Sequence, residues 1–127
     1  MPHFTVHISE TALDRKVEEG LIRGLADAVG SVYGEPFSRL VAVDLIGIPQ
    51  SRRGIGGAPT DQTAPHVTLS LREAAYQHPD VPDASARLIA AITDALVSVL
   101  GEQVREQAAV GLLAVPEGRS GIGGQVA

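Results

Sequence analysis

The 127-residue chain contains no cysteine and no tryptophan, and only 3% of its residues are aromatic. Without cysteine, a disulfide framework, a thiolate nucleophile and a thiolate metal site are all excluded. No apolar run approaches the roughly 20 residues that a transmembrane helix needs. The opening residues, Met1 to Phe4, lack the charged and apolar regions of a signal peptide. We therefore expect a single cytoplasmic domain with an aliphatic core and no membrane partner.

Positive charge is also scarce. The chain carries 10 lysine and arginine residues against 15 aspartates and glutamates, a formal charge of -5, which argues against a nucleic-acid partner. The four histidines have no metal-ligand spacing with carboxylates, so the sequence predicts no metal site. The chemistry of the protein must come from other groups.

The most informative feature present is an internal repeat. A shift of 67 places aligns residues 21–57 with 88–124 without a gap, and 17 of these 37 positions are identical. The motif Gly-Ile-Gly-Gly at 54–57 returns at 121–124, and the segment 2–5 is matched by 65–68 at a shift of 63. The second copy therefore has four extra residues, which we place at 76–82. We predict one domain made of repeat one (2–57), a linker (58–64) and repeat two (65–124).

Within each copy the spacing of apolar residues changes from two to about 3.6 and back, which indicates a strand, a helix and a second strand. Segments 4–8 and 67–71 alternate, the helical stripes end at Gly34 and Gly101, and 40–48 and 108–115 are nearly continuous apolar strands. A crossover of this kind places its two strands parallel. We predict an α/β (α+β) fold with a four-stranded sheet, both helices on one face, a pseudo-twofold axis between the copies and a β-hairpin after each. The other face is expected to be largely aliphatic and buried against further subunits.

These features together resemble 4-oxalocrotonate tautomerase: a proline directly after the initiator methionine, a repeated strand-helix-strand unit, and a Gly-Ile-Gly-Gly motif after it. The doubled chain resembles the fused members of the tautomerase superfamily, a group that also includes malonate semialdehyde decarboxylase and the cis-3-chloroacrylic acid dehalogenases. The resemblance covers nearly the whole chain. It implies a homotrimer that binds a small carboxylate substrate, uses no cofactor and has Pro2 as its catalytic residue.

An N-terminal proline is suited to this role because its secondary amine, held in a rigid ring, accepts a proton when it is uncharged. A free α-amino group titrates near 8, and burial or neighbouring guanidinium groups lower that pKa toward neutrality, where a general base works best. Pro65 cannot act in the same way, because its nitrogen lies inside an amide bond. A retained Met1 would make the nitrogen of Pro2 an amide as well.

Arginine is the side chain that the resemblance assigns to carboxylate binding, through two parallel hydrogen bonds. Arg72, at the end of the first strand of repeat two, matches an arginine that the dehalogenases and the decarboxylase carry there. The equivalent position in repeat one is Ser9, so we expect one working site per chain, built from Pro2 and Arg72. Further candidate substrate-binding cations are Arg53, Arg119 and Arg39.

The departures from the family pattern leave the reaction open. The two other substrate arginines of the tautomerase fall near Ala12 and near 41–42 here, and its aromatic residue before the hairpin is replaced by Arg53 and by Ser120. The decarboxylase's aspartate falls at Arg39, and the dehalogenases' water-activating carboxylate is missing. Keto-enol tautomerisation of a small 2-oxo acid requires the fewest groups and is our leading hypothesis. The alternatives are a hydratase or decarboxylase acting on a three-carbon acid, or a non-catalytic trimeric scaffold if Met1 is retained.

Overall fold

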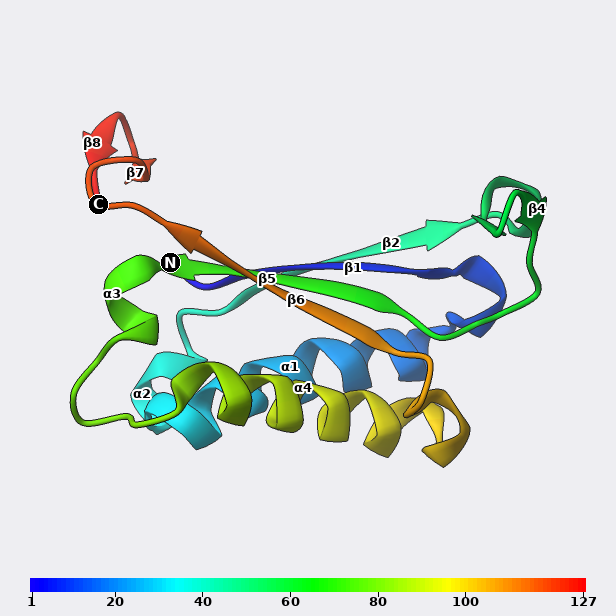
Figure 1. Ribbon diagram of the computed structural model, residues 1–127, viewed down its shortest axis with the longest axis horizontal. Coiled ribbons are helices and arrows are strands. Elements are labelled where there is room, and N and C mark those ends of the chain that lie inside the picture. Colours follow the sequence, from blue (N-terminus) through cyan, green and yellow to red (C-terminus); the bar gives the residue numbers. More distant parts are fainter.

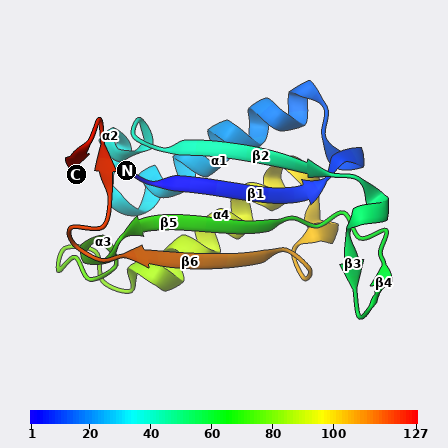
Figure 2. The same ribbon diagram turned by 90° about the horizontal axis from the view of Figure 1, so that it is seen from above.

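The computed structural model describes residues 1–127 and consists of a four-stranded sheet with two long helices on one face (Figure 1). The long helices are α1 (Arg15–Tyr33) and α4 (Ala84–Leu100). The strands are β1 (His3–Ser9), β2 (Ala42–Ile48), β5 (His66–Arg72) and β6 (Ala109–Val115). Their order across the sheet is β2-β1-β5-β6 (Figure 2). The predicted fold class and layer arrangement are confirmed.

Short elements connect these layers. The 3-10 helices are η1 (Glu10–Ala12), η2 (Gln50–Arg52) and η3 (Glu102–Val104), and the one-turn helices are α2 (Glu35–Ser38) and α3 (Glu73–Tyr76). The hairpins pair β3 (Gly54–Ile55) with β4 (Ala58–Pro59), and β7 (Gly121–Ile122) with β8 (Gln125–Val126). Both hairpins lie on the side of the sheet away from the helices, at opposite ends of the molecule (Figure 1). The expected linker at 58–64 thus begins inside the first hairpin.

Each hairpin turn depends on its glycines. Gly56 and Gly57 have φ angles of 64° and 86°, and Gly123 and Gly124 have φ angles of 61° and 80°. Two consecutive residues with positive φ form the tight turn that suits a two-residue hairpin, and glycine adopts this conformation without steric cost. The repeated Gly-Ile-Gly-Gly motif therefore specifies the same turn twice.

The strand register demonstrates the pseudo-twofold axis. β1 pairs with β2 in parallel with His3 opposite Ala42, and β5 pairs with β6 in parallel with His66 opposite Ala109. The central strands β1 and β5 are antiparallel, with Thr5 directly opposite Thr68. These threonines are equivalent in the two repeats, so the axis passes between them.

The core lies between the sheet and the helices. Its largest fully buried side chains come from alternate positions of β1 and β5 and from one face of each long helix: Phe4, Ile8, Leu21, Leu25, Leu69, Leu88, Ile92 and Leu96. Asp14 caps α1 by accepting a 2.8 Å hydrogen bond from the backbone N–H of Val17. None of the helices has the length and apolar character that spanning a bilayer requires.

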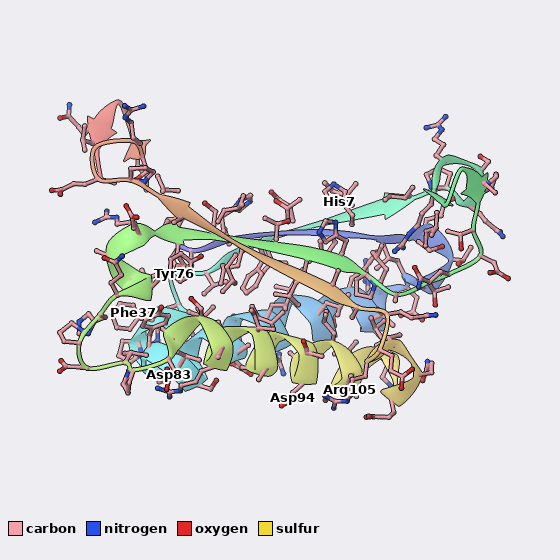
Figure 3. The ribbon with its side chains drawn as sticks, in the orientation of Figure 1. His7, Phe37, Tyr76, Asp83, Asp94 and Arg105 are labelled. Atoms are coloured by element: carbon pink, nitrogen blue, oxygen red, sulfur yellow. The ribbon has the colours of Figure 1, made fainter.

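The uncovered face of the sheet corrects one expectation. Phe4, Val6 and Ile8 all point to the helices, so the alternate positions of β1 and of its neighbour β5 point outward. These positions are polar: His3, Thr5, His7, His66, Thr68 and Ser70. Figure 3 shows His7 projecting from this face. On this face of the sheet, the exposed large aliphatic side chains lie on the outer strands, such as Ile46 at 42% and Leu113 at 55%, so the face is not largely aliphatic.

Candidate active site

A cavity of about 300 Å³ opens at the end of the molecule where β1 begins and β5 ends. Its lining residues are Met1, Pro2, Val29, Tyr33, Phe37, Leu40, Leu71, Arg72 and Ala75. β1 and β5 are antiparallel neighbours, with His3 opposite Ser70, and this places the residue before β1 beside the last residues of β5. The topology of the sheet therefore brings Pro2 and Arg72 to the same cavity.

Pro2 is held firmly at the wall of this cavity. It is buried, and its carbonyl oxygen accepts a 2.9 Å hydrogen bond from the backbone N–H of Ala42 at the start of β2. Met1 also lines the cavity but is 58% exposed. Removal of Met1 would therefore leave the nitrogen of Pro2 facing the cavity without disturbing the backbone contact that positions the ring.

Arg72 is the cationic group of the cavity. It is exposed and takes no part in the salt bridges or side-chain hydrogen bonds of the chain. The same residue also borders a second hollow of about 440 Å³, which it shares with Glu73 and Glu117 among others. Because those carboxylates disfavour an anion in the second hollow, the guanidinium group is better placed to bind one in the cavity that contains Pro2.

An aromatic and aliphatic wall completes the cavity. The Tyr33 hydroxyl donates a 2.8 Å hydrogen bond to the carbonyl of Ala75, and the Tyr33 ring lies 6.1 Å from that of Phe37 at an interplanar angle of 56°. Burial raises the pKa of Tyr33, although the positive charge of Arg87 opposes this shift. Tyr33 is therefore neutral near pH 7 and contributes ring surface, while its hydroxyl proton is already engaged.

Sequence reasoning missed Tyr33, Phe37 and Leu40 as lining residues. A signal was present in the repeat alignment, since the shift of 67 pairs Phe37 with Val104 and Leu40 with Gln107. In each pair, a large side chain in repeat one is replaced by a smaller or polar one in repeat two. Such pairs mark the place where the two ends of the sheet differ.

The structure brings none of the other candidate arginines into this cavity. Arg53 follows β2, whose end lies beside the end of its parallel neighbour β1, and so it occupies the opposite end of the sheet. There its guanidinium group donates to the carbonyl of Ala64, next to Pro65. Arg39 is exposed and paired with Glu35 at 3.2 Å. Arg119 lies in the turn before the β7–β8 hairpin.

Tyr76 lies at the same end of the molecule as Phe37 (Figure 3) but does not line the cavity. Its hydroxyl donates to the carbonyl of Leu113 on β6 at 2.9 Å, with the carbonyl of Leu69 on β5 at 3.3 Å. Burial raises the pKa of Tyr76 to about 12. This side chain therefore anchors α3 to the sheet and thereby supports the neighbouring Ala75.

Searches of protein-family models and of curated proteins found no match to this chain. Several solved structures have the same fold. A wild-type fused 4-OT in an asymmetric trimer is 23% identical with a TM-score of 0.82, covering 98% of this chain and 94% of that one. Pt0534 inactivated by 2-oxo-3-pentynoate is 20% identical with a TM-score of 0.80 and the same coverage. A member of the cis-3-chloroacrylic acid dehalogenase family is 14% identical with a TM-score of 0.79, covering 98% of this chain and 82% of that one. The resemblance indicated by the sequence thus extends to the whole fold, and this chain has the fused, two-repeat fold of the 4-OT proteins.

Proposed function

We propose that the protein is a tautomerase that interconverts the keto and enol forms of a small 2-oxo acid, with Pro2 as general base after removal of Met1. The observation that carries this proposal is the cavity itself. It combines a buried Pro2 with an arginine that has no partner in the chain. A base and an anion-binding group in one apolar pocket are the minimum that this reaction requires.

The reaction needs two proton transfers, one from the substrate to Pro2 and one from Pro2 back to the substrate. The uncharged amine of Pro2 takes the hydroxyl proton of the enol, and the resulting ammonium group returns a proton to the carbon next to the carbonyl. The guanidinium group of Arg72 binds the carboxylate and steadies the negative charge of the enolate between the two steps. General base catalysis of this kind contributes a rate factor of about 10²–10⁴.

The composition of the cavity favours an isomerase over a hydratase. Its lining contains no aspartate or glutamate, whereas activation of a water molecule needs a second base to accept the proton from water. Decarboxylation would produce a different product from the same pocket, and product analysis with a semialdehyde substrate separates the two reactions.

We further propose a homotrimer, by analogy with the trimeric fused 4-OT of the same fold. The aliphatic side chains exposed on the outer strands, including Ile46 and Leu113, would then contact other subunits. Sedimentation equilibrium of the purified protein measures this directly, and a monomer at micromolar concentration would contradict it.

The first measurement is the intact mass of the protein from its native host, because a mass without methionine is required for a free amine on Pro2.

Ketonisation of phenylenolpyruvate then tests whether Pro2 is the base. Pro2→Ala replaces the rigid secondary amine with a flexible primary amine and should lower kcat/KM by up to about 10²–10⁴-fold. The matched control Pro65→Ala should leave kcat/KM unchanged because that nitrogen is an amide. The acetylenic 2-oxo acid that inactivates Pt0534 provides an independent probe, since a nucleophilic Pro2 should acquire its mass. A retained methionine, or full activity of Pro2→Ala, would overturn the proposal.

A further inference from the structure

The uncovered face of the sheet carries two histidines that are distant in the sequence and adjacent in the structure. His7 on β1 is directly opposite His66 on β5 in the antiparallel pairing. Their chain neighbours Val6 and Val67 are buried against the helices, so both imidazoles lie on the face away from them (Figure 3). Residues directly opposite each other in antiparallel strands have Cβ atoms about 4.5–5.5 Å apart. The two rings can therefore reach one point above the sheet.

The same two imidazoles have no hydrogen-bond partner, unlike the other histidines of the chain. Nε2 of His3 lies 2.8 Å from a carboxylate oxygen of Asp44, and Nδ1 of His78 accepts a 3.1 Å hydrogen bond from a backbone N–H in its own turn. His7 is half-buried and His66 is exposed, and neither takes part in a side-chain hydrogen bond or a salt bridge. Because a neutral imidazole has one nitrogen with a free lone pair, each ring can still bind a ligand.

Two adjacent imidazoles with free nitrogens are suited to a divalent transition metal ion. Imidazole is a good ligand for Zn²⁺, Cu²⁺ and Ni²⁺, whereas Mg²⁺ and Ca²⁺ prefer oxygen. Zn–N distances of about 2.0–2.1 Å bring two bound nitrogens to roughly 3 Å from each other, which is compatible with rings on directly opposed residues. The formal charge of -5 also favours a cation over an anion on this surface.

Within one chain the pair supplies only two ligands. No three histidine, aspartate or glutamate side chains lie close enough together to hold an ion, so the other coordination positions are open. Exposed Ile46 and Leu113 lie on the same face, one on each outer strand. Contacts through these side chains in the proposed trimer would turn the face toward the other copies. The open positions then face water and the equivalent histidines of neighbouring subunits.

We propose that His7 and His66 form a binding site for a divalent transition metal ion such as Zn²⁺. One nitrogen of each imidazole binds the ion, which thereby joins β1 to β5 and so links the two repeats. The pair lies at the end of β1 opposite Pro2, so the site is separate from the cavity. The two ligands within the chain are independent of the proposed function, and only additional ligands from other copies rest on the proposed trimer.

Calorimetric titration of Zn²⁺ into the oligomeric protein, freed of metal by dialysis against EDTA, measures the affinity. His7→Gln and His66→Gln each remove one imidazole and keep a polar side chain. Each should raise the Kd at least about 10-fold, since even a group that only orients a metal ligand changes affinity 10–100-fold. His3→Gln is the matched control on the same strand and face, because its imidazole is already paired with Asp44, and it should leave the Kd unchanged. Absence of Zn²⁺ binding, or an equal rise of the Kd in His3→Gln and His7→Gln, would overturn the proposal.

Electron paramagnetic resonance with Cu²⁺ detects the ligands directly. Cu²⁺ binds nitrogen sites more tightly than Zn²⁺, and its nitrogen hyperfine splitting reports the bound imidazoles. The wild type should show at least two nitrogens, His66→Gln should show fewer, and His3→Gln should match the wild type. A spectrum that is the same in His66→Gln as in the wild type would place the ion elsewhere and refute the assignment.

The consequence for stability and the independence from the proposed activity can be measured on the same variants. Zn²⁺ should raise the Tm of the wild type and not that of His7→Gln, because an ion that binds the folded chain stabilises it. His7→Gln should keep the kcat/KM of the wild type for phenylenolpyruvate, since the pair lies away from Pro2. Zn²⁺ binding that requires both histidines in a protein sedimenting as a monomer would support the site and contradict the trimer alone.

Discussion

The two ends of the sheet are built from equivalent segments of the repeats, yet their contents differ. At one end Pro2 borders a cavity with Arg72, and Phe37 in that cavity is 47% exposed. At the other end Pro65 is fully buried, and Val104, the counterpart of Phe37, is 4% exposed. The large side chain therefore lines a hollow, while the small one is packed into the core.

The polar groups at the two ends also differ in whether they have hydrogen-bond partners within the chain. Ser9, the counterpart of Arg72, is 5% exposed and its hydroxyl hydrogen-bonds that of Thr11 at 2.9 Å. Next to Pro65, the carbonyl of Ala64 accepts a hydrogen bond from Arg53. The second end thus ties its arginine to the chain through one nitrogen, although Nη1 of Arg53 is buried without a hydrogen-bond partner. The first end leaves the guanidinium group of Arg72 without a partner in the chain.

The comparison shows how one backbone plan supports two local environments. The register of β1 with β2 matches that of β5 with β6, so the backbone is conserved between the copies. A few side chains decide whether the space at a strand end is filled or open. Exchanging or removing those side chains should therefore affect one end at a time.

The largest expected effect separates the two end arginines. Arg72→Ala should lower kcat/KM for phenylenolpyruvate roughly 10- to 100-fold, because charge-assisted hydrogen bonds contribute about 1.5–3 kcal/mol. Arg72→Lys should recover part of the loss, since lysine keeps the charge but not the paired geometry. Arg53→Ala is the control at the other end and should leave steady-state kinetics unchanged. Equal losses in both variants would mean that the ends cooperate in one site.

A smaller effect concerns stability. Val104→Ala should lower the free energy of unfolding by about 1.5–3 kcal/mol, because it removes two buried methyl groups and leaves a small cavity. Phe37→Ala should cost less, although it removes more atoms, because half of that side chain is already in water. Urea denaturation at one fixed protein concentration measures both. A larger loss for Phe37→Ala would indicate that the open end is closed by another subunit.

The smallest effect appears at alkaline pH. The pKa of Tyr76 is raised from 10.0 to about 12, chiefly by burial, so between these values the folded chain keeps a proton that the unfolded chain loses. Stability should therefore decline as the pH rises from about 10 to 12. Tyr76→Phe should reduce this decline, while costing about 1 kcal/mol at pH 7 through loss of the hydrogen bond to Leu113. An identical decline in both proteins would assign it to other groups.

Much of the architecture could be predicted from the sequence. Local backbone preferences are visible in three features of the sequence. These are the alternation in β1 and β5, the helical stripes that end at Gly34 and Gly101, and the repeated glycine motif. The joint position of Pro2 and Arg72 was also predictable, because the resemblance paired them and the topology of two strand-helix-strand units brings the start of one strand beside the end of the other.

The remaining features depend on tertiary structure. Part of the cavity wall, Phe37 and Leu40, comes from a segment after Gly34 that has no periodicity, so its direction is set by packing against α1. The position of Arg53 is a second example, because the parallel pairing of β1 and β2 places it at the end of the sheet opposite the cavity.

The amino-acid sequence by itself therefore determined the repeats, the elements and the polarity of each position, because these are local properties of the chain. Only the tertiary structure decided which end is hollow and which is filled. That outcome depends on how the volumes of side chains from distant segments add up in one place, as the exposure of Phe37 and the burial of Val104 demonstrate.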